Sequence, residues 1–277
     1  MEIYFTKMQG LGNDFILMDY IDGLDYSKLS KKMCDRHFGI GADGLIVVNP
    51  SDMQTSDTDI SWHIYNSDGT EPQMCGNGIR CLAKYAKDRA LVDKNKFSVN
   101  TLKGIVEPEI LNNGEIRVNM GAPILKKDKI PFLGSENLNF SIELDNNCFL
   151  ANAISMGNPH CVIFVDNDTK MLAEIFGREI ENNPNFPEKT NVEFVRILSR
   201  NEINMDVWER GCGITLACGT GSCASVVAGI LNDLLDNKVK VNLAGGSLLI
   251  EWDGNPDSPV YMTGEAKSVF SGVWHEE

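Results

Sequence analysis

The sequence predicts an α+β protein made of two pseudo-symmetric domains, each a curved antiparallel sheet or barrel wrapped around a central helix. Two observations predict this class. Short segments rich in β-branched and aromatic residues recur along the chain, and a set of landmarks in the first half returns in the same order in the second half. At 277 residues the chain is long enough for two ordinary domains.

The strand pattern is clearest in the first half, where short apolar runs are bounded by Gly, Asn and Asp. These runs are DFILMD (14–19), GLIVV (44–48), DISWHIY (59–65) and GEIRVNM (114–120). Helical spacing of apolar residues follows two cysteines: Ile79, Leu82, Ala83 and Ala86 after Cys75, and Ala224, Val226, Val227, Ile230, Leu231 and Leu234 after Cys218. The second helix carries almost no charge, so we expect its sheet to enclose it.

The repeat is defined by three landmarks at nearly constant separation. Cys75 and Cys218 each precede a Gly-x-Gly turn, and Asn66 and Glu209 each precede their cysteine by nine positions. The segments GNDFILMD (12–19) and GNPHCVIFVD (157–166) supply the third match. One such match could arise by chance, whereas three in the same order indicate an internal duplication.

The duplication predicts a domain of residues 1–120 and a second of residues 121–264, with a hinge around 119–127, where a Gly and a Pro interrupt the strand pattern. The remaining segment, 265–277, is expected to return as a strand that completes the first domain, because its backbone groups need a neighbour. The active site is expected at the domain interface.

The net charge of the chain argues against nucleic acid as a partner. A net charge of −14 would repel a phosphate backbone, so nucleic acid is not expected as a partner. The N-terminal segment lacks a targeting pattern and no apolar run approaches the ~20 residues that span a bilayer, so we expect no membrane association and a cytoplasmic location. A small-molecule substrate remains the expected ligand.

Eight cysteines are present, but no CxxC pair occurs and only four histidines accompany them, so no metal site is expected. Most of the cysteines are predicted to be reduced, buried and apolar in character. Cys75 and Cys218 are the exceptions because each stands at the first turn of a predicted helix. Backbone N–H groups and the helix dipole favour a thiolate there, and the following glycines let a ligand carboxylate reach the same N–H groups.

Two such turns on opposite sides of one carbon suit the inversion of a stereocentre next to a carboxylate. One thiolate would remove the α-hydrogen and the opposite thiol would deliver another, with no cofactor required if fixed N–H groups stabilise the developing charge. A disulfide between Cys75 and Cys218 is the structural alternative, and a thiol-based redox sensor or non-catalytic ligand-binding protein is the functional one.

These motifs resemble the diaminopimelate epimerase family along nearly the whole chain. The resemblance rests on GLGNDFI, RHFGIGADGLI, NSDG, MCGNGIRC, MGNPHCV, TNVEF, WERGCGITLACGTGSCAS and VFSGVW. It implies cofactor-independent epimerisation of LL-diaminopimelate to the meso form, in lysine and cell-wall precursor synthesis. A racemase of a ring substrate such as proline or hydroxyproline is the alternative within enzymes, but it has no second amino acid end for Glu209 and Arg210 to bind.

The resemblance also implies roles for individual residues. Cys75 and Cys218 would be the acid/base pair, and His160 and Glu209 would assist catalysis. The backbone groups that bind the reacting end of the substrate would come from Gly76, Asn77, Gly219 and Thr220. The far end of the substrate would be bound by Asn13, Asn66, Asn158, Asn191, Glu209 and Arg210.

Three further positions follow from the same resemblance. Gly44 replaces a Gln that many members carry, and Ile214 replaces a Glu, so details of the pocket are expected to differ. Phe270 lies where some members have an aromatic residue at a dimer contact, so a homodimer is expected.

Overall fold

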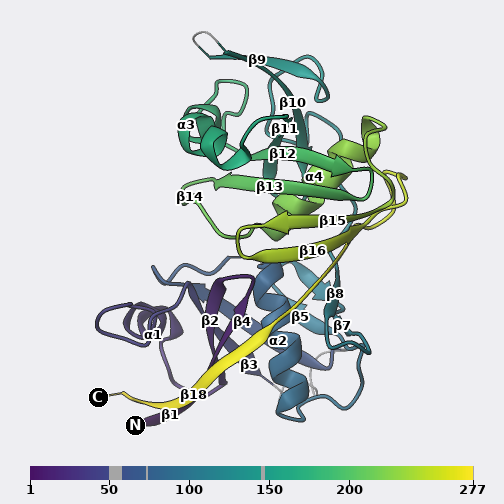
Figure 1. Cartoon of the computed structure of the whole chain (residues 1–277). Helices are drawn as coiled ribbons and strands as arrows, with labels where there is room; N and C mark the ends of the chain where they lie inside the picture. Colours follow the sequence, from purple (N-terminus) through teal and green to yellow (C-terminus); the bar gives the residue numbers. More distant parts are fainter. Residues whose placement is uncertain (50–57, 73, 145–146, 277) are drawn as a thin grey trace. The chain divides into compact units, whose positions relative to one another are not determined.

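The computed structural model describes residues 1–49, 58–72, 74–144 and 147–276. Its chain divides into two units, Met1–Asn119 together with Gly264–Glu277, and Met120–Thr263 (Figure 1). Each unit carries a sheet with helices packed on it. Within the described residues, no helix is both long and apolar enough to cross a membrane.

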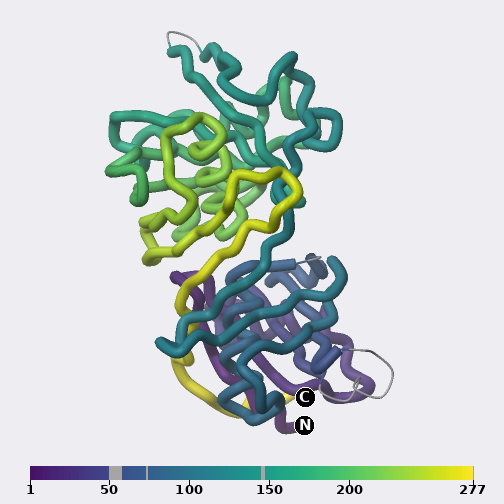
Figure 2. Tube along the Cα trace, turned by 90° about the vertical axis from the view of Figure 1, so that its right-hand side faces the viewer, coloured from purple at the N-terminus to yellow at the C-terminus, as the bar shows by residue number. Residues whose placement is uncertain are grey.

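The first unit contains two helices and a sheet in the order β18-β1-β2-β3-β4-β5-β6, with β7 paired to β8, among its described residues. Its elements are β1 (Glu2–Gly10), β2 (Asn13–Asp19), α1 (Tyr26–Met33), β3 (Gly44–Asn49), β4 (Ile60–Asn66), α2 (Gly76–Asp88), β5 (Val99–Thr101), β6 (Gly104–Val106), β7 (Glu109–Ile110), β8 (Ile116–Asn119) and β18 (Lys267–His275). The first and last strands of the chain lie side by side, with Glu2 opposite His275 (Figure 2).

The second unit has a sheet in the order β9-β10-β11-β12-β13-β15-β16-β17, with β14 paired to β13. Its elements are β9 (Phe140–Leu144), β10 (Asn147–Ser155), β11 (Pro159–Phe164), α3 (Thr169–Glu181), β12 (Asn191–Ser199), β13 (Glu202–Glu209), β14 (Gly213–Ile214), α4 (Gly219–Leu231), β15 (Lys238–Leu243), β16 (Gly246–Glu251) and β17 (Tyr261–Gly264).

The two sheets repeat one pattern of strand directions. In the first unit β18/β1, β1/β2, β3/β4 and β5/β6 are antiparallel, whereas β2/β3 and β4/β5 are parallel. In the second unit β9/β10, β10/β11, β12/β13 and β15/β16 are antiparallel, whereas β11/β12 and β13/β15 are parallel. This agreement, pair by pair, is the structural form of the internal duplication.

The α+β class is confirmed, and most strand pairs are antiparallel as expected, but each sheet also contains parallel pairs and is therefore mixed. A parallel step needs a crossover connection, and a helix occupies each one. In the first unit α1 joins β2 to β3 and α2 joins β4 to β5, and in the second unit α3 and α4 do the same. The apolar spacing predicted one dominant helix per half, after Cys75 and after Cys218, and gave no sign of α1 and α3. It also extended the last helix to Leu234, which lies beyond the end of α4.

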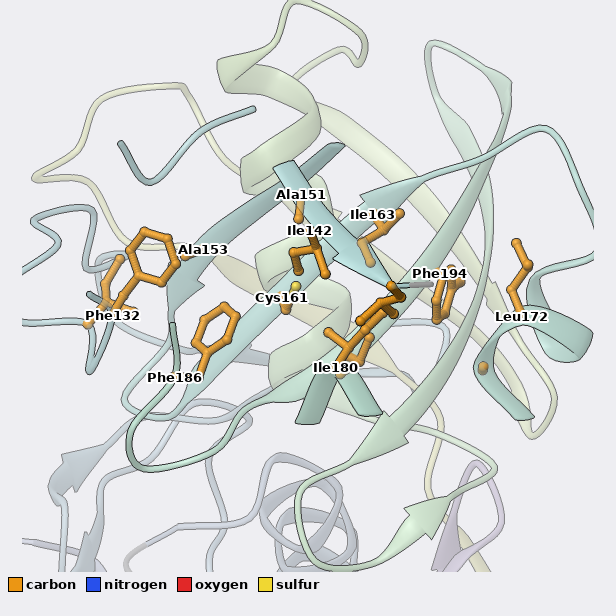
Figure 3. Close-up of a cluster of buried hydrophobic side chains, with 14 residues drawn as sticks. Phe132, Ile142, Ala151, Ala153, Cys161, Ile163, Leu172, Ile180, Phe186 and Phe194 are labelled. Carbon is orange, nitrogen blue, oxygen red and sulfur yellow. The ribbon is translucent and has the colours of Figure 1, made fainter. Parts of the chain in front are cut away.

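The central strands are buried on both faces, so alternate residues face different helices. In the first unit Ile16, Met18, Leu45 and Val47 pack with residues of α1 in one core cluster. In the second unit Cys161, Ile163, Val192 and Phe194 pack with residues of α3, and Figure 3 shows the side chains of this cluster. The residues between them on each strand therefore face α2 and α4, which is where the candidate site lies.

Candidate functional site

Cys75 and Cys218 are the N-caps of α2 and α4. The Cys75 Sγ accepts a hydrogen bond from the backbone N–H of Gly78 at 3.4 Å, and the Cys218 Sγ accepts one from Gly221 at 3.3 Å. The other helix of each unit is capped by an aspartate, Asp25 or Asp168. Because a thiol is a poor acceptor and is not among the preferred N-cap residues, capping alone does not explain a cysteine in both places.

The glycine three residues after each cysteine lies close to the strand beneath it, and more tightly in the second unit than in the first. A Cβ added to Gly78 would lie 3.3 Å from the tip of the Ile46 side chain on β3, and one added to Gly221 would lie 2.5 Å from a carboxylate oxygen of Glu193 on β12. Each helix start therefore lies directly on a central strand. The residue beneath it is apolar in the first unit and acidic in the second.

In the first unit, the partner of Cys75 is the amide of Asn13 at the start of β2. The Asn13 Oδ1 accepts a hydrogen bond from Asn77 Nδ2 at 3.2 Å and lies 3.9 Å from the Cys75 Sγ. The Asn13 Nδ2 donates to Asp43 at 2.7 Å. Because a carboxylate only accepts, Asp43 fixes the orientation of this amide, so the amide oxygen faces the thiol.

Asp43, which accepts from Asn13, belongs to a network of charged side chains. Arg36 donates to Asp14 at 2.8 Å and to Asp43 at 2.8 Å, and the Lys7 ammonium lies 2.7 Å from Asp14. Burial would raise the pKa of Asp14, but the hydrogen bonds from Arg36 and Lys7 outweigh it and lower that pKa to about 2. The strand start that carries Asn13 is thus bonded to a charged network.

Two more groups in the first unit shape the same turn. The guanidinium of Arg80, which is fully buried, donates to the Asn77 side chain at 2.9 Å and to the carbonyl oxygen of Gly76 at 3.2 Å. Asn66 ends β4, and its amide donates to Thr70 at 2.9 Å within the following turn. Cys75, Gly76, Asn77 and Asn13 therefore form one bonded group, whereas the Asn66 amide is bonded within its own turn.

In the second unit, Cys218 ends a continuous line of hydrogen bonds. Its Sγ lies 3.6 Å from the Thr220 hydroxyl, which accepts from Asn158 Nδ2 at 3.3 Å. The Asn158 Oδ1 lies 3.1 Å from His160 Nε2, and His160 Nδ1 lies 2.7 Å from Glu193. The side chains of His160 and Glu193 are fully buried. Of the predicted residues, Cys218, Thr220, Asn158 and His160 are joined in this line.

Glu209 is the other acidic group near this thiol. It ends β13 and accepts a hydrogen bond from Thr215 at 2.5 Å. Burial raises the pKa of Glu209. Burial also raises the pKa of Cys218 well above its ordinary value, the negative charges of Glu209 and Glu193 add to this, and the donors Thr220 and Gly221 oppose it. A protonated Cys218 thiol is therefore favoured before a ligand changes its surroundings.

Asn191 and Arg210 are joined through the backbone. The buried Asn191 side chain donates to the carbonyl oxygen of Pro159 at 2.9 Å and accepts from the backbone N–H of Arg210 at 2.9 Å. The exposed Arg210 guanidinium donates to the carbonyl oxygen of Glu188 at 3.0 Å. Asn191 thus holds the turn, and Arg210 presents its positive charge beside Glu209.

The remaining cysteines mostly follow the expectation of burial. Cys34, Cys81, Cys161 and Cys223 are buried, and burial raises the pKa of Cys34 to about 12 and that of Cys81 to about 12. Cys148 and Cys212 are exposed, so the expectation of burial holds for most of these cysteines but not for these two. Both lie near strand ends, at the start of β10 and just before β14, where their side chains leave the core.

Three residues of the site were not among those predicted from the sequence. Glu193 lies in the TNVEF motif, and its signal is a single carboxylate in an otherwise apolar strand. Asp43 and Arg36 lie in RHFGIGADGLI, where nothing in the spacing shows that they pair behind Asn13. Within the described ranges, no group of three His, Cys, Asp or Glu side chains is arranged to hold a metal ion.

The family model described as diaminopimelate epimerase matches residues 5–126 and 152–269. The chain belongs to the diaminopimelate epimerase family. It is 50% identical to diaminopimelate epimerase of Halothermothrix orenii, over 98% of this chain and 98% of that protein. It is 49% identical to the same enzyme of Desulfitobacterium hafniense, over 100% of this chain and 99% of that protein.

The fold recurs in solved structures of proteins with other names. A phenazine biosynthesis protein of the PhzF family from Bacillus anthracis matches with a TM-score of 0.69 at 15% identity, over 100% of both chains. A hydroxyproline epimerase from Agrobacterium vitis matches with a TM-score of 0.68 at 12% identity, over 98% of this chain and 92% of that chain. At these identities the comparison establishes the fold alone.

Proposed function

We propose that this protein is an isomerase that epimerises LL-diaminopimelate to meso-diaminopimelate, a step in lysine and cell-wall precursor synthesis. One observation carries the proposal. Each of two repeats places a thiol as the N-cap of its second helix, at corresponding positions of matching sheets. Membership of the diaminopimelate epimerase family supports the choice of substrate.

The proposed chemistry uses Cys75 and Cys218 as alternating general base and general acid. One thiolate removes the α-hydrogen, the other thiol donates a proton to the opposite face of the α-carbon, and the roles exchange in the reverse direction. This scheme requires both sulfur atoms to reach the same carbon. It needs no metal and no organic cofactor, because the groups that transfer protons belong to the chain.

The reacting carboxylate is proposed to bind the first turns of α2 and α4. The N–H groups of Gly76, Asn77, Gly219 and Thr220 belong to first turns, where N–H groups lack partners within the helix. Fixed donors of this kind stabilise the negative charge that develops when the α-hydrogen leaves. His160 and Glu209 are proposed to assist on the Cys218 side, where Glu209 lies beside the thiol and His160 is joined to it through Asn158 and Thr220 by three successive hydrogen bonds.

The far amino acid end of the substrate is proposed to be bound by charged and amide groups. The exposed guanidinium of Arg210 suits the distal carboxylate, and Glu209 suits the distal ammonium. Four amides complete the proposed set: Asn13, Asn66, Asn158 and Asn191. Recognition by polar groups would let the enzyme require one configuration at the distal centre.

Incubation with LL-diaminopimelate in D2O tests the proposal directly. The expected result is meso product with deuterium at one α-carbon, detected by mass spectrometry and chiral chromatography. Proline and hydroxyproline serve as control substrates and should incorporate no deuterium. Absence of both label and meso product with diaminopimelate would rule out the proposed reaction.

We also infer a homodimer in the cytoplasm, where thiols stay reduced. Support for the dimer comes from β1 and β18, which leave Tyr4, Val269, Phe270 and Val273 at least 38% exposed. Replacing Phe270 with Lys should raise the monomer fraction in analytical ultracentrifugation. An unchanged mass at all concentrations would exclude this edge as the contact.

A further inference from the structure

Glu193 is a buried carboxylate whose place in the other repeat is taken by an isoleucine. On β12 it pairs with Val162, and in the first unit the pair at the same position is Leu17 with Ile46. Ile46 packs under Gly78 and Glu193 packs under Gly221. An acidic side chain thus lies under the start of α4, where the matching position under α2 is apolar.

The Glu193 carboxylate sets the direction of the whole line of hydrogen bonds that ends at Cys218. An ionised carboxylate only accepts, so His160 Nδ1 must donate to it. The Asn158 amide donates through Nδ2 to Thr220 and turns its Oδ1 to His160 Nε2. The fully buried His160 and Glu193 side chains thus link this amide to β12.

The same direction continues to the sulfur. The Thr220 oxygen accepts from Asn158, and the Thr220 hydroxyl hydrogen is available to donate to the Cys218 Sγ 3.6 Å away. A donor aimed at sulfur favours the thiolate. It acts against burial and against the nearby negative charges of Glu209 and Glu193.

We propose that Glu193 is a positioning residue that orients His160, Asn158 and the Thr220 hydroxyl, so that a hydrogen-bond donor faces Cys218. In the first unit the positions of His160 and Glu193 are held by Phe15 and Ile46, both buried and apolar. Instead, the Asn13 amide oxygen, an acceptor, faces Cys75. Beyond the capping N–H that both share, Cys218 thus lies 3.6 Å from a hydroxyl and Cys75 lies 3.9 Å from an amide oxygen.

The test measures how fast each thiol reacts with iodoacetamide at a fixed pH, with the modified cysteines quantified by mass spectrometry. Glu193→Ile copies the residue of the first repeat and removes the acceptor. It should lower the rate at Cys218 by about tenfold, equivalent to one unit in pKa, and leave the rate at Cys75 in the same molecule unchanged. Ile46→Val is the matched control and should change neither rate.

Two further variants separate positioning from a loss of structure. Glu193→Gln retains an oxygen that accepts from His160 Nδ1, so the Cys218 rate should stay within about threefold of wild type. Thr220→Val removes the final donor and should give the same drop as Glu193→Ile, with no further drop in the double variant. If Glu193→Ile does not fold, as judged by circular dichroism, Thr220→Val decides the matter alone.

The ionisable groups that face Cys218 are Glu209 from β13, Glu193 from β12 and His160 from β11. A pH profile of Cys218 alkylation should shift upward in Glu193→Ile and Thr220→Val alike. A Cys218 rate equal to wild type in either folded variant, or a Gln variant as slow as the Ile variant, would overturn the proposal. The alkylation result does not depend on turnover, so failure of the proposed epimerisation would be recognised separately, in the wild-type assay.

The expected effect of Glu193→Ile on turnover rests on the proposed function. Glu193→Ile should lower kcat by about tenfold, in line with the lower thiolate fraction, while KM stays within about twofold. An equal rise in KM with unchanged kcat would instead assign Glu193 to substrate binding and contradict a role through Cys218.

Discussion

The Cys75 turn and the Cys218 turn have the same backbone but different surroundings. Each sulfur caps a helix and accepts from the glycine three residues on. Behind Cys75 lie an amide oxygen and apolar side chains, and behind Cys218 lie a hydroxyl, an imidazole and two carboxylates. The duplication has thus preserved the helix start while the side chains that tune each thiol have diverged.

This difference matters because an enzyme that runs in both directions needs each thiol both as acid and as base. Two thiols with identical surroundings would be equally acidic in the empty site. Here burial and two negative charges raise the pKa of Cys218, and an acceptor lies beside Cys75. Local chemistry, rather than the repeated fold, therefore sets how readily each thiol ionises.

The largest expected effect tests whether both turns act. Cys75→Ala and Cys218→Ala should each lower kcat with LL-diaminopimelate by about 10⁴-fold, since each removes one proton-transfer group. Denaturation midpoints should stay within a few degrees of wild type, which separates lost chemistry from lost folding. Full activity in either variant would show that one thiol is dispensable and that the comparison has no catalytic meaning.

The next effect concerns Gly78 and Gly221, because the side chains packed against these two glycines differ between the repeats. Gly221→Ala would place a Cβ 2.5 Å from Glu193, whereas Gly78→Ala would place one 3.2 Å from the flexible tip of Ile64. We expect losses of about 3 kcal/mol and about 1 kcal/mol in the free energy of unfolding, measured by guanidinium titration. Equal losses would mean that Glu193 moves aside freely.

A third effect belongs to the first unit alone. Its carboxyl Asp14 has a pKa lowered from 3.8 to about 2 in the folded state, so its stabilisation is present above pH 3.8 and is lost as pH falls toward 2. Asp14→Asn should cost about 2 kcal/mol at neutral pH, and the difference from wild type should shrink between pH 4 and 2. Urea titrations at stepped pH measure it. A constant difference over that range would exclude the charge as its source.

The smallest effect concerns a feature that the two units share. Asp25 and Asp168 cap α1 and α3 through equivalent bonds of 3.1 Å and 3.0 Å. Asp25→Ala and Asp168→Ala should therefore cost about 1 kcal/mol each in thermal or chemical unfolding. Clearly unequal costs would show that these caps, unlike the sheet order, have diverged in energy.

The predicted strands DFILMD, GLIVV and DISWHIY overlap β2, β3 and β4 because apolar runs bounded by Gly and Asn carry a strong local signal. The amphipathic helix α1 was missed because it is short and rich in lysine, and its burial depends on a sheet that forms elsewhere in the chain. The parallel steps were missed for a related reason: strand direction depends on crossovers, which leave no periodicity in the sequence.

The candidate site shows the same limit. Motif spacing identified both cysteines and the residues on their turns, whose chemistry depends on local sequence. It gave no role to Glu193, Asp43 or Arg36, because their effect is exerted through other side chains across strands. Only the register that sets Glu193 opposite Val162, on the face toward α4, brings its carboxylate near Cys218.

The pairing of β18 with β1 has a consequence for biosynthesis. A ribosome makes β1 before the second unit and β18 only after that unit has been synthesised. The edge of β1 therefore emerges without β18, and its unpaired backbone groups stay available to chaperones or to other nascent chains. Ribosome-stalled chains ending before residue 267 should expose this edge, and chains that include β18 should not.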